Sequence, residues 1–99
     1  MMEKCKLPAD FKISEYLHAF KQLAPISGVN EGMDDNTVIY VANCAFAKYC
    51  DSLQKAGVAK QKDTTWTILS SEKTILAHMN VMPIAIHSGA NIVFVDSFN

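Results

Sequence analysis

The sequence predicts an α/β (α+β) fold, in which a small mixed sheet of about four strands has helices packed on both faces. Two short apolar runs at residues 37–42 and 92–96 predict the central strands, because wholly apolar, β-branched runs suit strands that are buried on both sides. Two amphipathic segments, 12–24 and 44–56, predict the main helices. The order helix, strand, helix and further strands then favours a single mixed sheet with one helix on each face.

Length and composition are those of one domain. The chain has 99 residues, of which 49% are hydrophobic, so it can form one core. The charged fraction of 19% is low for a free-standing domain; this is compatible with a surface covered by a partner and equally with an ordinary monomer. The net charge is −1, and every basic residue is a lysine, with no basic run. Because arginine is the usual reader of phosphates and bases, direct nucleic-acid binding is not expected.

The cysteines and the apolar runs indicate the compartment. Cys5, Cys44 and Cys50 make an odd count, and the last two are six residues apart on one predicted helix, where they point in different directions. We therefore expect reduced thiols in a cytosolic setting. Residues 1–7 carry charges and no apolar signal region, and no apolar run approaches the ~20 residues needed to span a bilayer. No membrane association is expected.

The first predicted helix, 12–24, follows a frayed segment at residues 1–7. Asp10 can cap its start, and Pro25 stops it. Apolar residues recur at spacings of three and four: Ile13, Tyr16, Leu17, Phe20, Leu23 and Ala24. This spacing predicts that one face of the helix is buried and that Tyr16 is a core residue.

The segment 26–36 has the composition of a loop, with two glycines and two asparagines. Its acidic residues Glu31, Asp34 and Asp35 raise the question of a calcium site. However, the alternating oxygen ligands and the terminal glutamate of an EF-hand loop are absent. A solvated loop is the prediction for this segment.

The central part of the chain predicts a strand at 37–42 followed by a helix at 44–56. Asn43 is placed as the helix N-cap. Lys55 and Gly57 suit the last turn and the left-handed position after it. The buried face of the helix is predicted to consist of Phe46, Tyr49, Cys50 and Leu53.

The C-terminal part predicts further strands after a polar, mobile segment at 58–63. Residues 64–69 have strand composition, and 74–76 are expected to start another short strand after a turn at 70–73. After a connector at 77–80, the run 81–87 reads as a strand that lies at an edge or has a bulge, because Pro83 removes one ladder donor. This strand and 92–96 are close enough in sequence to form an antiparallel hairpin.

No residue set in the sequence requires a particular reaction. Cys44 or Cys50 could pair with His78 or His87 as nucleophile and base, and Cys44 would lie in the first turn of its helix, where the dipole lowers a thiol pKa. No oxyanion-hole glycine accompanies either cysteine, so we expect Cys44 to be a packing residue with an ordinary thiol.

Metal and cofactor sites are not expected either. His18, His78, His87 and the cysteines have no metal-ligand spacing, and the glycines are isolated, so that none forms a phosphate-binding loop. We predict no catalytic, metal or cofactor-binding residue.

The order of elements resembles that of a known family. The amphipathic helix is followed by 35–41 (DNTVIYV), by a helix through Tyr49 and Leu53, and then by 75–84 (ILAHMNVMPI) and 90–95 (ANIVFV). This arrangement is similar to the axial domain of the tailed-bacteriophage major capsid protein fold. The spine helix and N-terminal arm of that fold have no counterpart here, so the resemblance implies a fragment, an isolated axial-type domain or a diverged relative.

Two functional hypotheses follow. The resemblance implies a phage or prophage capsid-like structural protein that self-assembles into a shell, without catalysis or cofactor, in the bacterial cytoplasm or the virion. Its expected partner is a second copy, held weakly through the loops at 26–36 and 58–63 and through Trp66, which could be an interface aromatic. The alternative is a small cytosolic α/β enzyme or ligand-binding module that uses Cys44 and a histidine.

Overall fold

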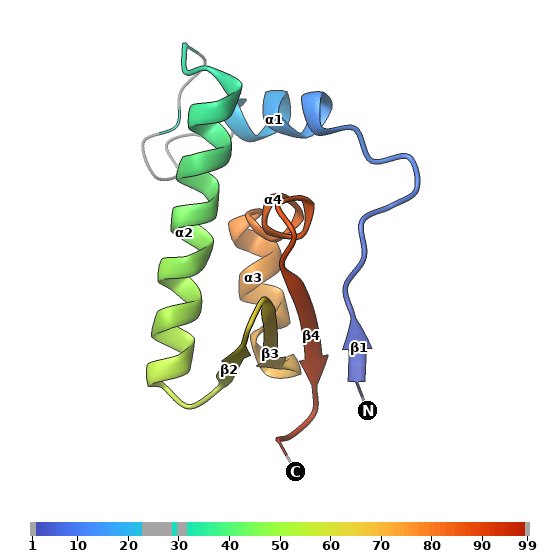
Figure 1. Ribbon diagram of the computed structural model, residues 1–99, viewed down its shortest axis with the longest axis vertical. Helices are drawn as coiled ribbons and strands as arrows, with labels where there is room; N and C mark the ends of the chain where they lie inside the picture. The colour runs from blue at the N-terminus through green and yellow to red at the C-terminus, as the bar shows by residue number, and fades with distance from the viewer. Residues whose placement is uncertain (1, 23–28, 30–31, 99) are drawn as a thin grey trace.

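The computed structural model describes residues 2–22, 29 and 32–98. Figure 1 shows a long helix, α2, along one side of a small sheet, with α3 behind the sheet and α1 across one end. In chain order the elements are β1 (Met2–Lys4), α1 (Ile13–Gln22), α2 (Asp35–Lys55), β2 (Ala59–Lys62), β3 (Thr65–Leu69), the 3-10 helix η2 (Ser70–Glu72), α3 (Lys73–Met79), α4 (Met82–His87) and β4 (Asn91–Val95).

The strands form one mixed sheet in the order β1-β4-β3-β2. The outer pairs β1–β4 and β2–β3 are antiparallel, and the central pair β3–β4 is parallel. A parallel pair needs a crossover connection, which η2, α3 and α4 provide. Asp63 sits at φ 54 in the tight β2–β3 turn, a left-handed conformation that aspartate tolerates.

The strand register divides the side chains of the sheet between two faces, because neighbouring side chains on a strand point to opposite sides. The core face carries Ala59, Trp66, Ile68, Ile92 and Phe94. The outer face carries Lys4, Lys60, Lys62, Thr65, Thr67, Leu69, Val93 and Val95. Buried residues of all four α-helices join the core face in one hydrophobic cluster. A mixed fold of helices and strands is therefore confirmed, whereas helices on both faces are not.

The predicted strand at 37–42 is wrong, because these residues form the first turns of α2. The helix begins at Asp35 rather than after Asn43, and the side chain of Asp34 caps it by accepting a hydrogen bond from the Thr37 backbone N–H at 2.9 Å. The buried residues Val38, Ala42, Phe46, Cys50 and Leu53 then form one stripe with spacings of four and three. Packing of this stripe on the sheet outweighs the β-propensity of the apolar run. The predicted burial of Phe46 and Leu53 is confirmed.

The predicted strands at 81–87 and 74–76 are also wrong, since they lie mainly in α4 and α3. Pro83 occupies the first turn of α4, where its missing N–H has no hydrogen bond to lose. Asn80 ends α3 in a left-handed conformation at φ 56, so most of the predicted connector 77–80 is helical. The hairpin expected between 81–87 and 92–96 is accordingly absent; β4 pairs with β3 and β1 instead.

Two segments predicted to be irregular are strands. The polar segment 58–63 contains β2, and the segment 1–7, expected to be frayed, contains β1, whose pairing continues where the Cys5 N–H donates to the Ile92 carbonyl at 2.9 Å. The predictions for α1, for a strand at 64–69 and for a strand at 92–96 are confirmed within a few residues. The stop at Pro25 and most of the loop 26–36 lie outside the described residues.

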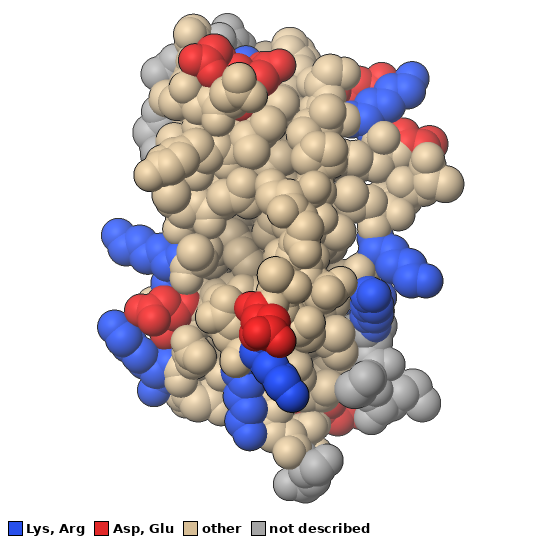
Figure 2. Space-filling view, viewed as in Figure 1, with Lys and Arg blue, Asp and Glu red and all other residues tan. Residues whose placement is uncertain are grey.

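Charged side chains are unevenly distributed over the molecule. In the space-filling view, most lysines lie over the half that contains the sheet and the end of α2, with a few acidic groups among them, and other acidic groups lie at the opposite end near the start of α2 (Figure 2). Some lysines have carboxylate partners: Lys21 lies 2.9 Å from Asp35, Lys55 lies 3.2 Å from Asp51, and Lys12 lies 4.0 Å from Glu15. The net charge of −1 therefore conceals a local excess of lysine near the sheet.

Candidate functional site

The thiols and imidazoles considered as catalytic groups do not come together. Cys44 lies in the middle of α2 and is exposed, so its predicted position in a first helical turn and its predicted role in packing are both wrong. Cys50 is the buried thiol of this helix, and desolvation by burial raises its pKa to about 12. A thiol with a raised pKa stays protonated at neutral pH, which is the unreactive form.

The histidines stand on separate helices. His18 on α1, His78 on α3 and His87 on α4 are all exposed. His87 has an aromatic neighbour in Phe11, whose ring centroid lies 6.0 Å from that of His87. Within the described residues, no hydrogen bond or ion pair joins a cysteine to a histidine, and no group of three His, Cys, Asp or Glu side chains could hold a metal ion.

A cavity lies between the chain that leaves β1, the start of α1 and the start of α4. We call it the N-terminal pocket; its volume is about 640 Å³. Its apolar and aromatic lining comes from segments far apart in the sequence: Leu7, Pro8, Phe11, Tyr16, Met82, Pro83 and Ile86. Charged residues line it as well: Lys4, Lys6, Asp10, Lys12 and Glu15. Cys5 completes the described lining.

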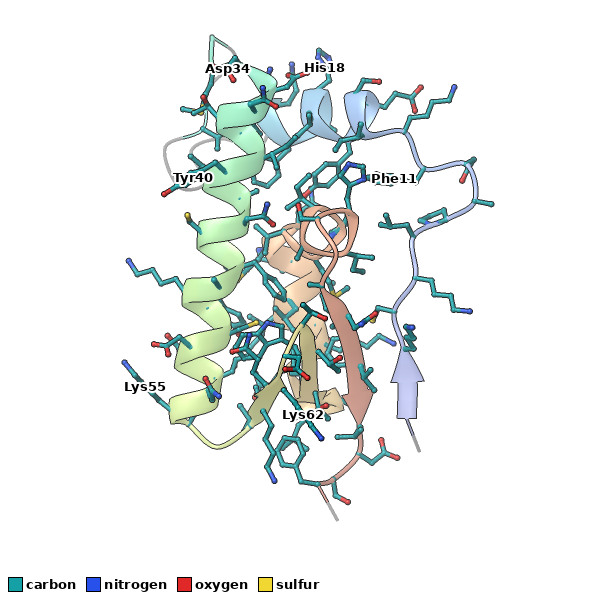
Figure 3. The ribbon with its side chains drawn as sticks, in the orientation of Figure 1. Phe11, His18, Asp34, Tyr40, Lys55 and Lys62 are labelled. Atoms are coloured by element: carbon teal, nitrogen blue, oxygen red, sulfur yellow. The ribbon has the colours of Figure 1, made fainter. Side chains whose placement is uncertain are left out.

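Local contacts explain how the N-terminal segment holds its shape. The Phe11 N–H donates to the Pro8 carbonyl at 3.0 Å, which closes a turn as the chain enters α1. The ring of Phe11 then lies 5.9 Å from that of Tyr16, and Tyr16 stacks at 5.8 Å on Phe20, which is fully buried. Figure 3 shows Phe11 between the N-terminal segment and α4. One wall of the pocket is therefore anchored in the core.

The hydroxyl group of Tyr16 ties this wall to the turn between α3 and α4 by donating to the Asn80 carbonyl. Burial raises the pKa of Tyr16, so the phenol remains a donor at any physiological pH. The turn that precedes α4 is thus fixed against α1. The pocket wall from Met82 to Ile86 follows directly from that turn.

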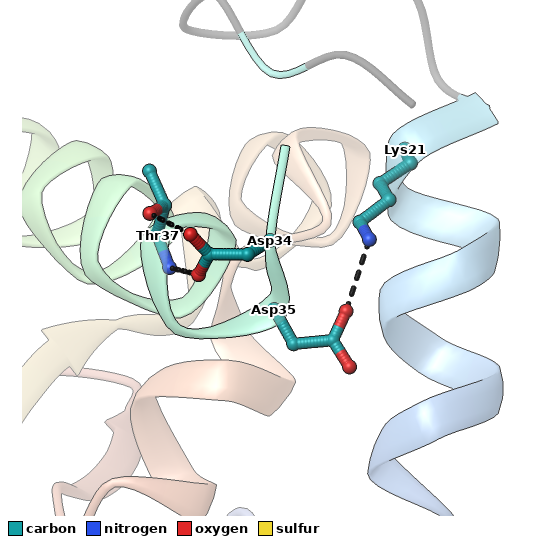
Figure 4. Close-up of polar contacts among 4 residues, drawn as sticks. All are labelled: Lys21, Asp34, Asp35 and Thr37. Carbon is teal, nitrogen blue, oxygen red and sulfur yellow. Dashed lines mark hydrogen bonds and ion pairs between the residues drawn. The ribbon is translucent and has the colours of Figure 1, made fainter. Parts of the chain in front are cut away.

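Helix α1 is also held against α2. Figure 4 shows Lys21 at the end of α1 reaching Asp35 in the first turn of α2, next to the cap that Asp34 makes on Thr37. Lys21 is mostly buried in this contact, whereas Asp35 is exposed, so the pair adds orientation more than stability. Helix α1, which lines the pocket through Glu15 and Tyr16, is therefore positioned by two independent contacts, one to Asn80 and one to α2.

Trp66, considered as an interface residue, is part of the core instead. Only 8% of its surface is exposed, and its ring meets Phe46 of α2 edge-on at 6.4 Å. The expected contact through Trp66 is therefore wrong. The large hydrophobic side chains that are exposed in the described residues are Tyr40 on α2, at 64%, and Ile75 on α3, at 49%.

Sequence reasoning missed the N-terminal pocket because its walls meet only in the folded chain. A signal was present in Pro8 and Phe11, a rigid and a bulky residue at the predicted entrance to the first helix. Comparison of the chain with protein families, with curated proteins and with solved structures finds no match. As for membranes, no helix in the described part of the chain has both the length and the apolar character to cross a bilayer.

Proposed function

We propose that the chain is a binding module that holds a small, mainly apolar ligand in the N-terminal pocket and performs no chemistry on it. The observation that carries the proposal is the pocket itself, whose volume of about 640 Å³ falls in the ~300–1,000 Å³ range of small-molecule sites. Its lining is mostly apolar, with charged groups around it, as such sites require. The alternative hypothesis from the sequence includes a ligand-binding module that uses Cys44 and a histidine. We keep the binding module, but neither Cys44 nor a histidine lines the pocket.

A binding role is favoured over catalysis by the state of the candidate nucleophiles. Burial keeps the Cys50 thiol protonated, and Cys44 has no histidine partner among the described residues. A thiol nucleophile needs a lowered pKa or an adjacent base. Cys50 has a raised pKa instead, and Cys44 has no adjacent histidine among the described residues, so the structure offers no support for a thiol-based reaction.

The lining suggests the form of the ligand. An apolar body would contact Phe11, Met82 and Ile86, which would remove its surface from water at ~25 cal/mol per Å². A polar end of the ligand would remain near the charged residues that also line the pocket. Anilinonaphthalene sulfonate, a fluorescent probe with an aromatic body and one charged end, matches this description.

Filling the pocket tests the proposal. We expect saturable fluorescence enhancement of anilinonaphthalene sulfonate by the native protein, and loss of this signal in Ile86→Trp, because the indole would occupy the pocket. Ile75→Trp is the matched control, since Ile75 is half exposed on α3 and does not line the pocket. Near-UV circular dichroism of each protein must show fixed packing, because loosened states bind the dye as well. Equal dye binding by both variants would contradict the proposal.

We propose the capsid-like structural role as a second candidate, supported by the exposed Tyr40. This large side chain is 64% exposed on α2, and a surface aromatic of this kind is typical of protein interfaces. Two segments behind the resemblance, 35–41 and 75–84, are largely helical, and we place the contact on this surface of α2 instead of on Trp66 and 58–63. The role would require a weak, concentration-dependent self-association.

Sedimentation velocity tests this second candidate. The structural role predicts monomer at micromolar concentration and a rising sedimentation coefficient as concentration increases about a hundredfold, with Tyr40→Ser weakening the association. His18→Ser, an exposed substitution on α1, is the control. An ideal monomer throughout the range would contradict self-assembly and leave the binding module as the supported function.

A further inference from the structure

We propose that the outer face of the sheet binds single-stranded nucleic acid through its lysines and Phe98. The proposal starts from the register of the strands. Lys60 pairs with Thr67, Thr67 with Val93, and Val93 with Lys4, so these four residues form one row across the sheet. Lys62, paired with Thr65, belongs to the next row on the same face. Lys60 and Lys62 belong to one strand, and strand pairing brings Lys4, which is far from them in the sequence, to the same face.

The row has lysines at both ends and small side chains between them. Neighbouring strands lie ~4.8 Å apart, so the three intervals between Lys60 and Lys4 span roughly 14 Å. Thr67 and Val93 occupy the middle of the row, where Thr67 is half-buried and Val93 is buried, so the contacts with an external ligand fall to the lysines at its ends. Lys60 and Lys62 are exposed, and neither forms an ion pair with a described residue. Their charges are therefore available to an external anion.

An aromatic ring lies beside the same lysines. The Lys60 ammonium group is 4.6 Å from the centroid of the Phe98 ring, a cation–π contact at the end of the described chain. Phe98 is half-buried, so part of its ring meets solvent. Single strands bind on surfaces that combine cations with an aromatic ring, because phosphates contact the cations and bases stack on the ring.

The alternatives fit this face less well. It offers no projecting helix or ribbon for a duplex groove. Its apolar residues Leu69 and Val95 are partly or wholly buried, so it lacks the exposed large apolar side chains of a membrane-inserting surface. The absence of arginine, which argued against nucleic acid at the level of sequence, argues here against base-specific recognition. Asp63 in the neighbouring turn reduces the local positive charge. Binding should therefore be modest, independent of sequence and strongly dependent on salt.

The test is fluorescence anisotropy with a fluorescein-labelled oligothymidylate of about 15 nucleotides, within the site sizes of single-strand binding surfaces. Three lysines that each neutralise one phosphate predict a slope of about −2 in a plot of log Kobs against log salt concentration. Lys60→Ala/Lys62→Ala should weaken binding by at least about tenfold at low salt and lower the slope toward −1. Phe98→Ala should weaken binding ~5- to 100-fold through loss of stacking.

Lys48→Ala/Lys55→Ala is the matched control, because it removes two exposed lysines from α2 and leaves the outer face intact. This double variant should bind as the native protein does. Equal losses in the two double variants, or no anisotropy change at low salt, would overturn the proposal. So would tighter binding to a duplex of the same length, which would indicate a general polyanion surface, or binding to phosphatidylserine vesicles without oligonucleotide binding, which would indicate a membrane surface.

Discussion

At the scale of single residues, position on the α2 stripe decides which side chains are structural. Successive helical residues are rotated by ~100°, so Cys44, two positions after the buried Ala42, falls on the opposite side of the helix. Leu53 and Phe46 were assigned correctly because their spacing does not depend on where the helix starts. Cys44 was misassigned because a helix beginning at residue 44 placed it in a first turn.

Leu53→Ala should cost ~2–5 kcal/mol of unfolding free energy, because the truncated side chain leaves a cavity in a closed part of the core. Urea titration measures this loss. Ile75→Ala, a truncation of similar size at a half-exposed position of α3, serves as the control and should cost less than ~1 kcal/mol. Similar losses in both variants would contradict the burial assigned to Leu53.

At the scale of elements, two helix starts account for most of the difference between prediction and structure. Asp34 and Thr37 carried a capping signal three residues apart, but the apolar run that follows favoured a strand, and short apolar runs do not distinguish a buried helix from a buried strand. At α4, Pro83 was interpreted as a defect in a strand, although proline in a first helical turn is equally typical. In both places tertiary packing, which the sequence does not display, selected the helix.

The cap at Asp34 makes stability depend on pH. Hydrogen bonds from the Thr37 backbone and hydroxyl lower the pKa of Asp34 below that of the unfolded chain. A lowered folded-state pKa means that the contribution is complete above the unfolded carboxyl pKa of ~3.9 and is lost as pH falls through the folded value. Chemical denaturation of the native protein should show this loss at acidic pH.

Two substitutions separate the cap from its charge. Asp34→Asn keeps an oxygen that accepts the Thr37 N–H but does not titrate, so it should remain close to native stability at neutral pH and lose less below pH ~4. Asp34→Ala removes the cap and should be less stable than Asp34→Asn at neutral pH. If the two variants were equally stable at neutral pH, Asp34 would not be the cap that starts α2.

At the scale of the whole molecule, the sequence predicted the mixture of helices and strands, α1, β3 and β4, but not how they pair. The parallel β3–β4 pair, enclosed by β1 and β2, depends on contacts between residues far apart in the chain. The N-terminal pocket and the outer face of the sheet also depend on contacts between residues far apart in the chain. The N-terminal pocket needs Leu7 and Ile86 to meet, and the outer face needs Lys4 and Lys60 in one row. Periodicity and composition carry no information about such distances.

The central claim is that the N-terminal pocket is a ligand site, and amide chemical shifts recorded during titration with anilinonaphthalene sulfonate test it most directly. The aromatic rings of the probe shift nearby nuclei, so the largest changes should appear at residues 5–11, at Tyr16 and at 82–86, with the outer-face residues 60–67 little affected. The same titration of Ile86→Trp should show these changes reduced. Shifts concentrated on residues 60–67, or spread evenly over the chain, would contradict the claim that the ligand binds beneath the N-terminal segment.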